Sequence, residues 1–389
     1  MKDLYQELGV SASKHEVHHA IKCLPTSAFP GAFCFLAADP LDPAIVHAMH
    51  ADGAGTKANV AYIAFRETGS PQWFRTIAQD SVVMNLDDLV CIGLTNNFIL
   101  SNTIGRNATI IPGSVLSSLL EGYQTFVSEM SAQGIQIIMA GGETADSGDT
   151  VRTLVVDSTL YGRMPRSKVI DFSRVQPGNC IIGFSSVGQT TYETHENSGI
   201  GSNGFTLARH VLLSKEYRDR YPEYFAPELP KNSVYRGKYL ISDKLPNSDL
   251  TVGEALLSPT RTYAPVVNKL LTENFEAING IIHNTGGGLT KCQKFGNSVE
   301  YFKEDLLSMP PIFSLIADEG NLDDRTMFST FNCGQRLEVF CDPRHAEWVL
   351  KVAADFGVAA KVIGAVRASA DGQNRVFVRK ANGEFERFE

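Results

Sequence analysis

The sequence of 389 residues contains no uninterrupted apolar run of the ~18 residues that a membrane-spanning helix requires. Its first residues, MKDLYQELGVSASKHE, also lack the apolar core of a secretory signal peptide. The 43 acidic residues outnumber the 35 lysines and arginines, and a net charge of -8 argues against a broad nucleic-acid-binding surface. We therefore expect neither a membrane nor a nucleic acid as partner, and we expect a cytoplasmic protein.

The seven cysteines show no metal-ligand spacing, and an odd number in a chain this long is typical of reduced thiols. Cys34 lies in the apolar context AFCFL, which favours a buried thiol. The histidines of the first 50 residues are also scattered, and we expect them on a solvated surface. Cysteines and histidines thus give no sequence signal for a metal site.

What the sequence does contain is a polar motif, DGAGTK, between an extended run (AIVHAM) and an apolar, helical one (ANVAYIAF). A Gly-rich turn between a strand and a helix exposes backbone N–H groups that can face phosphate oxygens. Lys57 could neutralise phosphate charge and Asp52 could hold a divalent cation beside it. The spacing is not that of a Walker A loop, and the same residues also fit a plain polar turn.

The segment from 77 to 90 has apolar residues at three- and four-residue spacing, which predicts a helix with one buried face. Its charged positions are Asp80, Asp87 and Asp88. Three aspartates without a basic partner suggest a bound cation, although an acidic turn near a helix N-terminus is the alternative.

Strands alternate with helices from about 45 to 165, and the pattern restarts at 175–186 after a turn. We predict an α/β (α+β type) protein with two domains, residues 1–168 and 169–389. In the first, a buried strand at 135–140 is expected to run into a loop at Gly141 and Gly142 that presents Glu143. We expect the polar, aromatic segment 214–250 to be a surface excursion with little chemistry.

Seven motifs occur in the order DGAGTK, LDDL, GGETAD, GSNG, LLSPTRTY, HNTGGG and TFNCG. With these motifs the chain resembles the aminoimidazole ribonucleotide synthetase (phosphoribosylformylglycinamidine cyclo-ligase) family of purine biosynthesis, over roughly residues 31–364. The resemblance implies two PurM-like domains, the first with a mixed sheet, and a homodimer formed through the first domains. It also implies an ATP- and Mg²⁺-dependent ring closure of a small ribonucleotide substrate, formylglycinamidine ribonucleotide.

The resemblance and the chemistry of the motifs together assign residues to this reaction. ATP is expected to contact Asp52, Gly53, Gly55, Thr56, Lys57, Asp88, Gly141, Gly142 and Glu143. Mg²⁺ is expected to be held by Asp52, Asp88 and Glu143. The substrate is expected to contact His195, Ser202, Asn203, Thr285, Gly286, Gly287 and Gly288. Catalysis is expected to use His283, Asp88 and Lys57, with His283 as a proton shuttle; a strand-end histidine bound by the backbone is the alternative.

The chain departs from the family pattern at Gly201, where the family has a histidine. The preceding loop is long, and we expect its His195 to take over the contact and a histidine at position 201 to be tolerated. Two other functions stay open. One is another ATP-dependent enzyme of the superfamily, such as a selenophosphate synthetase, a thiamine-phosphate kinase or a formylglycinamide ribonucleotide amidotransferase. The other is a non-catalytic nucleotide-binding homologue.

Overall fold

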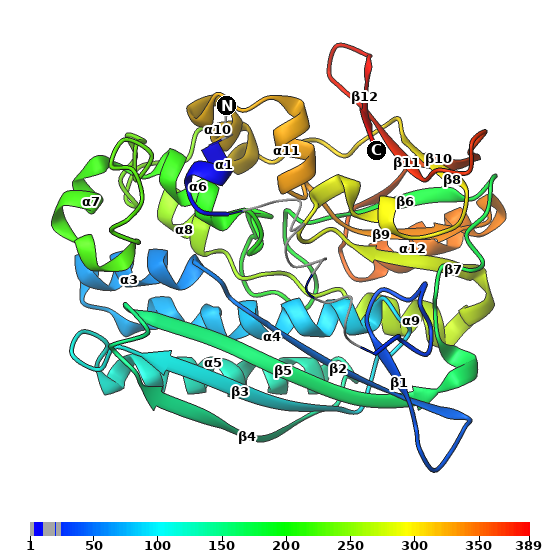
Figure 1. Cartoon of the computed structure of the whole chain (residues 1–389), viewed down its shortest axis with the longest axis horizontal. Coiled ribbons are helices and arrows are strands. Elements are labelled where there is room, and N and C mark those ends of the chain that lie inside the picture. Colours follow the sequence, from blue (N-terminus) through cyan, green and yellow to red (C-terminus); the bar gives the residue numbers. More distant parts are fainter. Residues whose placement is uncertain (1–3, 11–19, 21–24) are drawn as a thin grey trace.

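The computed structural model describes residues 4–10, 20 and 25–389, which form two sheets with helices packed between and around them (Figure 1). The two α/β halves expected from the sequence are thus present. None of the helices in this described part of the chain is long and apolar enough to span a membrane.

The first sheet is mixed and has the order β1-β2-β5-β3-β4. Its strands are antiparallel neighbours except for the parallel pair of β3 and β4. The strands are β1 (Leu36–Ala38), β2 (Ile45–Gly53), β3 (Phe98–Arg106), β4 (Ile137–Asp146) and β5 (Leu154–Pro165). Buried and exposed residues alternate along β3 and β5, so one face of this sheet packs inward and the other faces solvent.

The second sheet has the order β12-β11-β8-β10-β6-β9-β7. In Figure 1 it lies on the other side of α4 from the first sheet. Only β8 and β11 run parallel. The strands are β6 (Cys180–Ser185), β7 (Ile278–His283), β8 (Val299–Lys303), β9 (Gln335–Cys341), β10 (Ala360–Ala368), β11 (Arg375–Arg379) and β12 (Phe385–Phe388). Strands β6 and β9 are buried at every residue, because both of their faces are covered.

Helices supply the layer between the sheets and part of the outer surface. The α-helices are α1 (Leu4–Glu7), α3 (Lys57–Thr68), α4 (Arg75–Val90), α5 (Gly113–Ala132), α6 (Phe205–Leu212), α7 (Lys215–Arg220), α8 (Val252–Leu257), α9 (Ala264–Asn274), α10 (Pro311–Gly320), α11 (Asp324–Thr330) and α12 (Ala346–Asp355). The 3₁₀ helices are η2 (Pro71–Phe74), η3 (Arg166–Lys168), η4 (Pro222–Tyr224), η5 (Phe275–Ala277), η6 (Gly288–Lys294) and η7 (Pro343–His345).

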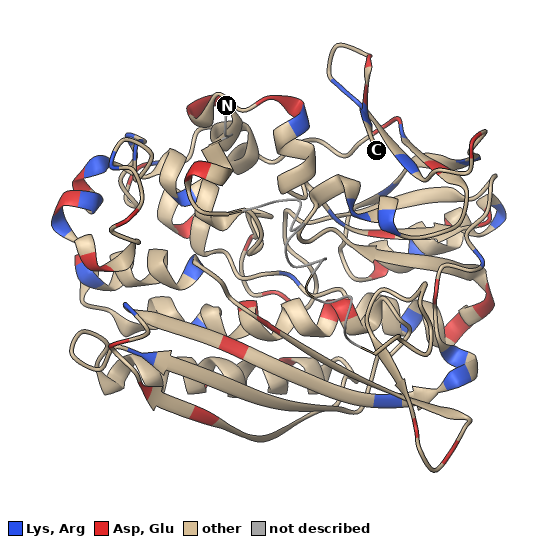
Figure 2. Cartoon of the chain, in the orientation of Figure 1, with Lys and Arg blue, Asp and Glu red and all other residues tan. Residues whose placement is uncertain are grey.

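Helix α4 is the centre of the molecule. It packs on β2 and β5 of the first sheet, on α5, and on α9 and β7 of the second half of the chain. All of its residues except Arg75, Thr76 and Gln79 are buried. The prediction of one buried face is therefore wrong, because the two halves of the chain cover this helix from opposite sides. Figure 2 shows its acidic segments in the interior.

The glycines of GGETAD lie in a strand and not in a loop. Strand β4 runs through the whole motif, and its register against β3 shifts between Leu100 and Asn102. Gly141 has a φ of 103°, which a glycine adopts without strain at such a bulge. The loop prediction is thus wrong, because a glycine pair marks a bulge in an edge strand as well as it marks a turn.

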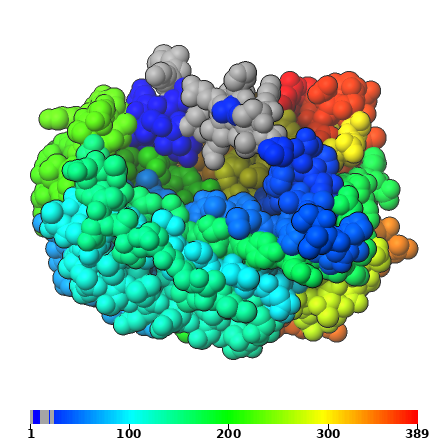
Figure 3. All heavy atoms as spheres, turned by 60° about the horizontal axis from the view of Figure 1, so that its bottom comes forward, coloured from blue at the N-terminus to red at the C-terminus, as the bar shows by residue number. Residues whose placement is uncertain are grey.

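The outer face of the first sheet carries an apolar row. Met49, Tyr161, Ile99 and Ile138 are in register across β2, β5, β3 and β4. The exposed fractions of Met49 and Ile138 are 67% and 64%. Figure 3 views the molecule from this side. An apolar row of this length on a sheet face is a feature of a contact surface.

The segment 214–250 is packed more tightly than a surface excursion. Tyr217, Tyr224 and Tyr235 are buried, and the rings of Tyr224 and Tyr235 lie 4.9 Å apart. The segment is anchored to α6, where Nδ1 of His210 accepts a hydrogen bond from the backbone N–H of Tyr235 at 3.3 Å. The aromatic residues that interrupt this segment therefore form a small core of their own.

We expect His210 to limit stability in acid. Burial, reinforced by the neighbouring Arg209, lowers the pKa of His210 to about 2, whereas an unfolded histidine titrates near 6.5. Between these values the unfolded chain binds more protons, so the folded state loses stability as pH falls below about 6.5. At pH 5 this loss amounts to ~2 kcal/mol.

Urea unfolding of the wild type and His210→Gln at pH 8 and pH 5 measures this loss. We expect the variant to lose less stability than the wild type over this interval. The same substitution at half-buried His345 serves as the control. An equal acid loss in wild type and His210→Gln would contradict the assignment.

Candidate active site between the two halves

Three of the predicted motifs meet at one cavity of about 250 Å³. It is lined by Gly55 and Thr56 before α3, by Ser202–Gly204 before α6, and by Gly286 and Gly287 after β7. Thr56 Oγ1 lies 3.0 Å from Thr206 Oγ1, so the two halves of the chain are hydrogen-bonded at its edge. Residues from distant parts of the sequence thus form a single polar cavity.

The glycines of the TGGG motif differ in role: two of them line the cavity and the third is packed against neighbouring backbone. The backbone N–H groups of Gly286 and Gly287 donate no hydrogen bond to any described residue, and both residues line the cavity. Gly288 is a packing position, since a Cβ there would collide with the backbone carbonyls of Phe328 and Phe331. The backbone of Thr285 is fixed, because its carbonyl accepts from Gly288 N at 2.8 Å. Two amides are therefore available to an anion in the cavity.

Lys57 does not face this cavity. Its side chain is fully buried, and Nζ donates to Asp80 Oδ1 at 2.8 Å and to the carbonyl of Ser258 at 2.5 Å. Burial lowers the pKa of Lys57, and the Asp80 carboxylate partly offsets this effect. The structure thus gives Lys57 a protein carboxylate as its partner where the sequence suggested a phosphate.

The PTRTY segment holds the acids of α4. Asp80 Oδ1 accepts from N and Oγ1 of Thr260 at 2.7 and 2.6 Å, and Asp87 Oδ1 accepts from Oγ1 of Thr262 at 2.6 Å. Arg261 between them pairs with Glu193 at 2.6 Å. The sequence analysis used this segment only as a family signature, although its alternating hydroxyl groups could have indicated carboxylate partners.

Arg336 of β9 is the second cation of this interior. It is fully buried, and its charge acts on Asp87, Asp80 and Asp88. Burial raises the pKa of Asp87 to about 7, against the stabilising contacts from Thr262 and Arg336. The interpretation of three aspartates without a basic partner is therefore wrong for Asp80, because Lys57 and Arg336 come from distant segments that the local sequence does not show.

Asp88 and His283 form the one pair that joins two predicted catalytic residues. His283 Nδ1 lies 2.7 Å from Asp88 Oδ1, and both side chains are buried. Burial alone would raise the pKa of Asp88, but the hydrogen bond from His283 brings this pKa below its ordinary value. Burial, with the charge of Arg336, lowers the pKa of His283 to about 4. The imidazole is thus neutral at pH 7, with Nδ1 as donor to Asp88.

The three predicted magnesium ligands are not gathered within one chain. Asp52 pairs in register with Ser158, Asn102 and Gly142 across the sheet, so β2 and β4 lie roughly 14 Å apart. Glu143 is paired in register with Thr103 of β3. Its side chain is exposed on the outer face of the sheet. Asp52 and Asp88 flank Asn85, whose Nδ2 donates to the carbonyl of Asp52 at 3.2 Å. The structure therefore does not bring Glu143 to Asp88 within one chain, and it connects Asp52 with α4 through the Asp52 backbone carbonyl.

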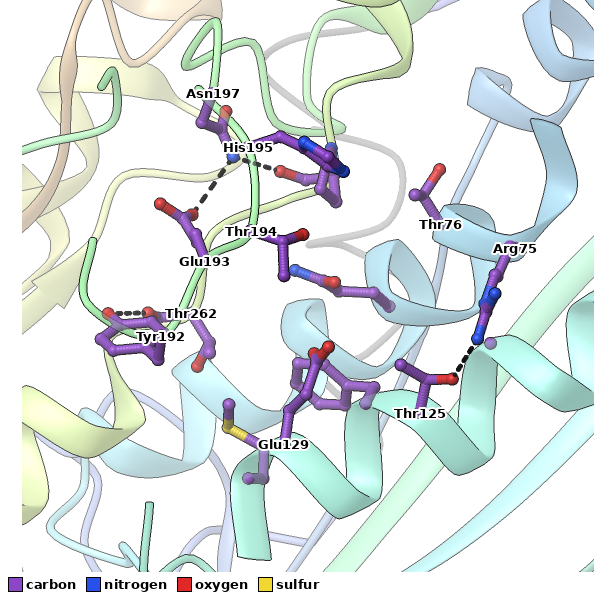
Figure 4. A pocket seen from close by; sticks show the side chains of 15 residues that line it. Arg75, Thr76, Thr125, Glu129, Tyr192, Glu193, Thr194, His195, Asn197 and Thr262 are labelled. Atoms are coloured by element: carbon purple, nitrogen blue, oxygen red, sulfur yellow. Dashed lines mark hydrogen bonds between the residues drawn. The ribbon is translucent and has the colours of Figure 1, made fainter. Parts of the chain in front are cut away.

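His195 lies at a different cavity. A space of about 380 Å³ between α4, α5 and the loop around 190–197 is lined by His195, Arg75, Glu129 and Thr194, among others (Figure 4). It shares no lining residue with the cavity of Gly286 and Gly287. The structure thus does not bring His195 together with Ser202 and Asn203 as the sequence analysis expected.

The backbone and surroundings of Gly201 argue against the expectation that a histidine is tolerated at this position. Gly201 has a φ of 67°, and a Cβ there would collide with Nη1 of the buried Arg336. We expect Gly201→Ala to destabilise the fold by at least ~1 kcal/mol more than Gly69→Ala, because overpacking is added to the same backbone strain. Gly69 is the matched control, with a φ of 72° and open space around it. Equal losses in urea denaturation would show that Arg336 moves aside without loss.

The sequence matches two family descriptions over most of its length. Residues 40–164 match "AIR synthase related protein, N-terminal domain", and residues 176–376 match "AIR synthase related protein, C-terminal domain". A phosphoribosylformylglycinamidine cyclo-ligase of Methanocaldococcus jannaschii is 29% identical over 330 residues, covering 85% of this chain and 81% of the relative. One of Lachnospira eligens is 26% identical and covers 95% of this chain and 94% of the relative.

Solved structures of the same fold are less similar in sequence than these relatives. This chain superposes on one chain of the HypE–HypF complex with a TM-score of 0.56 and 13% sequence identity. The match covers 96% of this chain and 99% of the other. Thermotoga maritima PurL complexed with FGAR gives a TM-score of 0.55 at 13% identity, covering 97% of this chain and 49% of that one. Another PurL structure is described as complexed with ATP. At this identity these likenesses concern the fold alone.

Proposed function

The chain belongs to the AIR synthase related protein family, a family with enzyme members, and we propose that it is itself a phosphoribosylformylglycinamidine cyclo-ligase. It would use ATP to close formylglycinamidine ribonucleotide to aminoimidazole ribonucleotide, with release of ADP and phosphate. The single observation that carries this proposal is that curated relatives of that name, such as the Lachnospira eligens protein, align over nearly the whole chain.

The site supports a phosphate-bearing substrate. The amides of Gly286 and Gly287 and the side chains of Ser202 and Asn203 line one cavity, and such donors suit a ribose phosphate. Gly55 and Thr56, which precede α3, also line this cavity, and helix N–H groups there suit the phosphates of a nucleotide. The cavity thus offers donors from both halves of the chain to two phosphorylated ligands.

Asp88 is the carboxylate that we place at the reacting end. Asp52 and Asp88 would hold Mg²⁺, which supplies charge neutralisation for phosphoryl transfer when it is bound. His283 holds Asp88 in its orientation through the 2.7 Å contact. In the ring closure, the formyl oxygen is phosphorylated and leaves as phosphate after the nitrogen attacks, and the released proton has to be accepted near this pair.

We propose that two copies of the chain associate through the outer face of the first sheet. The apolar row of Met49, Tyr161, Ile99 and Ile138 would be buried by a second copy. Glu143 lies on this face, so association would also place it beside the partner. A dimer therefore gives a reason for the exposed row that the single chain does not.

Replacing Ile138 by aspartate should convert the dimer to a monomer, because a charge buried in an apolar interface is left without a partner. Sedimentation velocity at micromolar concentration measures the change. Leu41→Asp is the matched control, since Leu41 is 93% exposed and lies in the turn between β1 and β2. A monomeric wild type, or a dimeric Ile138→Asp variant, would remove the proposed interface.

The activity is tested with purified chain, Mg–ATP and formylglycinamidine ribonucleotide. We expect one ADP and one phosphate for each aminoimidazole ribonucleotide formed. Formylglycinamide ribonucleotide is the control substrate, because its amide nitrogen is a much weaker nucleophile than the amidine nitrogen that attacks the formyl carbon. Turnover of this control with ammonia, or ATP consumption with selenide or thiamine phosphate, would identify a different enzyme of the superfamily. No ATP turnover with any of these substrates would favour a non-catalytic homologue.

A further inference from the structure

Cys34, His50 and Asp88 come together from three elements. Cys34 precedes β1, His50 lies on β2, and Asp88 is in the last turn of α4. Their sulfur, nitrogen and carboxylate oxygen atoms all lie within 4.8 Å of one another. Cys34 and Asp88 are buried, and His50 reaches the surface with 24% of its side chain exposed. The cluster thus has two interior donors and one at its opening.

The imidazole of His50 is oriented by a residue outside the cluster. Asn85 Nδ2 donates to the carbonyls of Ser81 and Ser158 at 2.9 and 3.1 Å, which fixes the Asn85 amide so that its Oδ1 faces His50. His50 Nδ1 lies 2.9 Å from this oxygen and must therefore carry the proton. The other ring nitrogen, Nε2, lies 3.4 Å from Asp88 Oδ2. Metal-binding histidines are held in this way by a second acceptor.

The other two donors are also placed by their neighbours. Asp88 uses Oδ1 for His283, which leaves Oδ2 to the cluster. Cys34 Sγ lies 3.2 Å from the backbone carbonyl of Asp88. The ring of Phe33, next in the chain, stacks on Phe295 with centroids 5.2 Å apart and so anchors this segment. The three ligand atoms are therefore held close to one another in the described chain.

We propose that, in the resting chain, Cys34, His50 and Asp88 bind a thiophilic divalent cation of the zinc class in place of the Mg²⁺ proposed for Asp88, with a fourth position open to solvent beside His50. Sulfur and imidazole nitrogen suit zinc and disfavour magnesium, which requires oxygen ligands. Binding breaks the S–H bond of Cys34, forms a bond from sulfur to the cation and releases the proton to solvent. A thiolate and a carboxylate together neutralise the charge of the cation.

The proposal is tested on the resting full-length chain, without nucleotide or substrate, so its outcome is independent of the proposed function. Cobalt(II) is titrated as a spectroscopic substitute for zinc, and zinc is then added in competition. We expect one cobalt per chain, a thiolate-to-cobalt charge-transfer band, and loss of that band on adding zinc. Cys333→Ser, at another buried thiol, should keep the band.

Cys34→Ser should abolish the charge-transfer band, and His50→Gln should weaken cobalt binding at least 10-fold. Since Cys34 is buried, circular dichroism checks the fold of its variant. His50 is partly exposed and provides a second variant that decides the question if Cys34→Ser does not fold. No band in the wild type, a band that persists in Cys34→Ser, or unchanged affinity in His50→Gln would each overturn the proposal.

Discussion

Lys57→Met should destabilise the protein by about 3–5 kcal/mol, because it leaves the Asp80 carboxylate buried without its cation. Both side chains of this pair are fully buried, 2.8 Å apart. Thr260 still donates to Asp80 in the variant, but neutral donors do not replace a charge. Urea denaturation followed by circular dichroism measures the loss. The effect is expected in the absence of nucleotide, which separates it from a role in phosphate binding.

The double variant Lys57→Met/Asp80→Asn should recover most of this stability, since an amide at position 80 accepts the Thr260 hydrogen bonds without a buried charge. The control is the exposed pair of Lys269 and Glu273, where Lys269→Met should change stability by no more than ~0.5 kcal/mol. If Lys57→Met weakens ATP binding and leaves stability unchanged, the ion pair opens in solution and Lys57 does face a phosphate.

Asp88→Asn should lower turnover by about 10²-fold or more, the range lost when a metal ligand or its support is removed. The asparagine oxygen still accepts from His283 Nδ1, so the geometry is kept and the charge is lost. Asp87→Asn is the matched control, because Asp87 accepts from Thr262 and Tyr263 and faces the domain interior. Steady-state kinetics of both variants measure the contrast. Equal activity of the two variants would remove Asp88 from the site.

His283 distinguishes positioning from proton transfer at the same site. His283→Ala should lower kcat by about 10²-fold, within the range for lost acid–base groups. His283→Asn should recover much of this loss, since its amide can replace Nδ1–H as donor to Asp88. We expect this recovery because His283 is wholly buried and its pKa of about 4 keeps it neutral. If Asn is as inactive as Ala, the Nε2 atom carries the proton and the shuttle predicted from the sequence is correct.

The local elements around the motifs could be predicted because each has a strong local pattern. The strand before DGAGTK, the helix after it and the helix ending before Gly134 all form where hydrophobic spacing places them. The fold class follows from the alternation of these elements, and the family descriptions agree with it. The loop predicted for GGETAD is wrong, because the same glycines can form either a turn or a bulge in an edge strand.

The partners of the charged residues could not be predicted, because they lie far away in the sequence. Asp80 takes donors 180 residues later, at Thr260, and Arg336 approaches from β9. His50 was expected on a solvated surface, and its contact with Asn85 across 35 residues carries no local signal. His15, His18 and His19 lie outside the described residues. Charge pairing therefore depends on topology, which local spacing does not encode.

The hydrogen bonds from the PTRTY segment to the aspartates of α4 can form only late in the synthesis of the chain. Helix α4 leaves the ribosome about 170 residues before Thr260 and Thr262, which cap its aspartates. At 5–20 residues per second this interval lasts roughly 8–34 s. During that time the buried acids of α4 lack their partners and the apolar side that later meets α9 is uncovered. The nascent first half therefore exposes an apolar helical surface until the second half is synthesised and covers it.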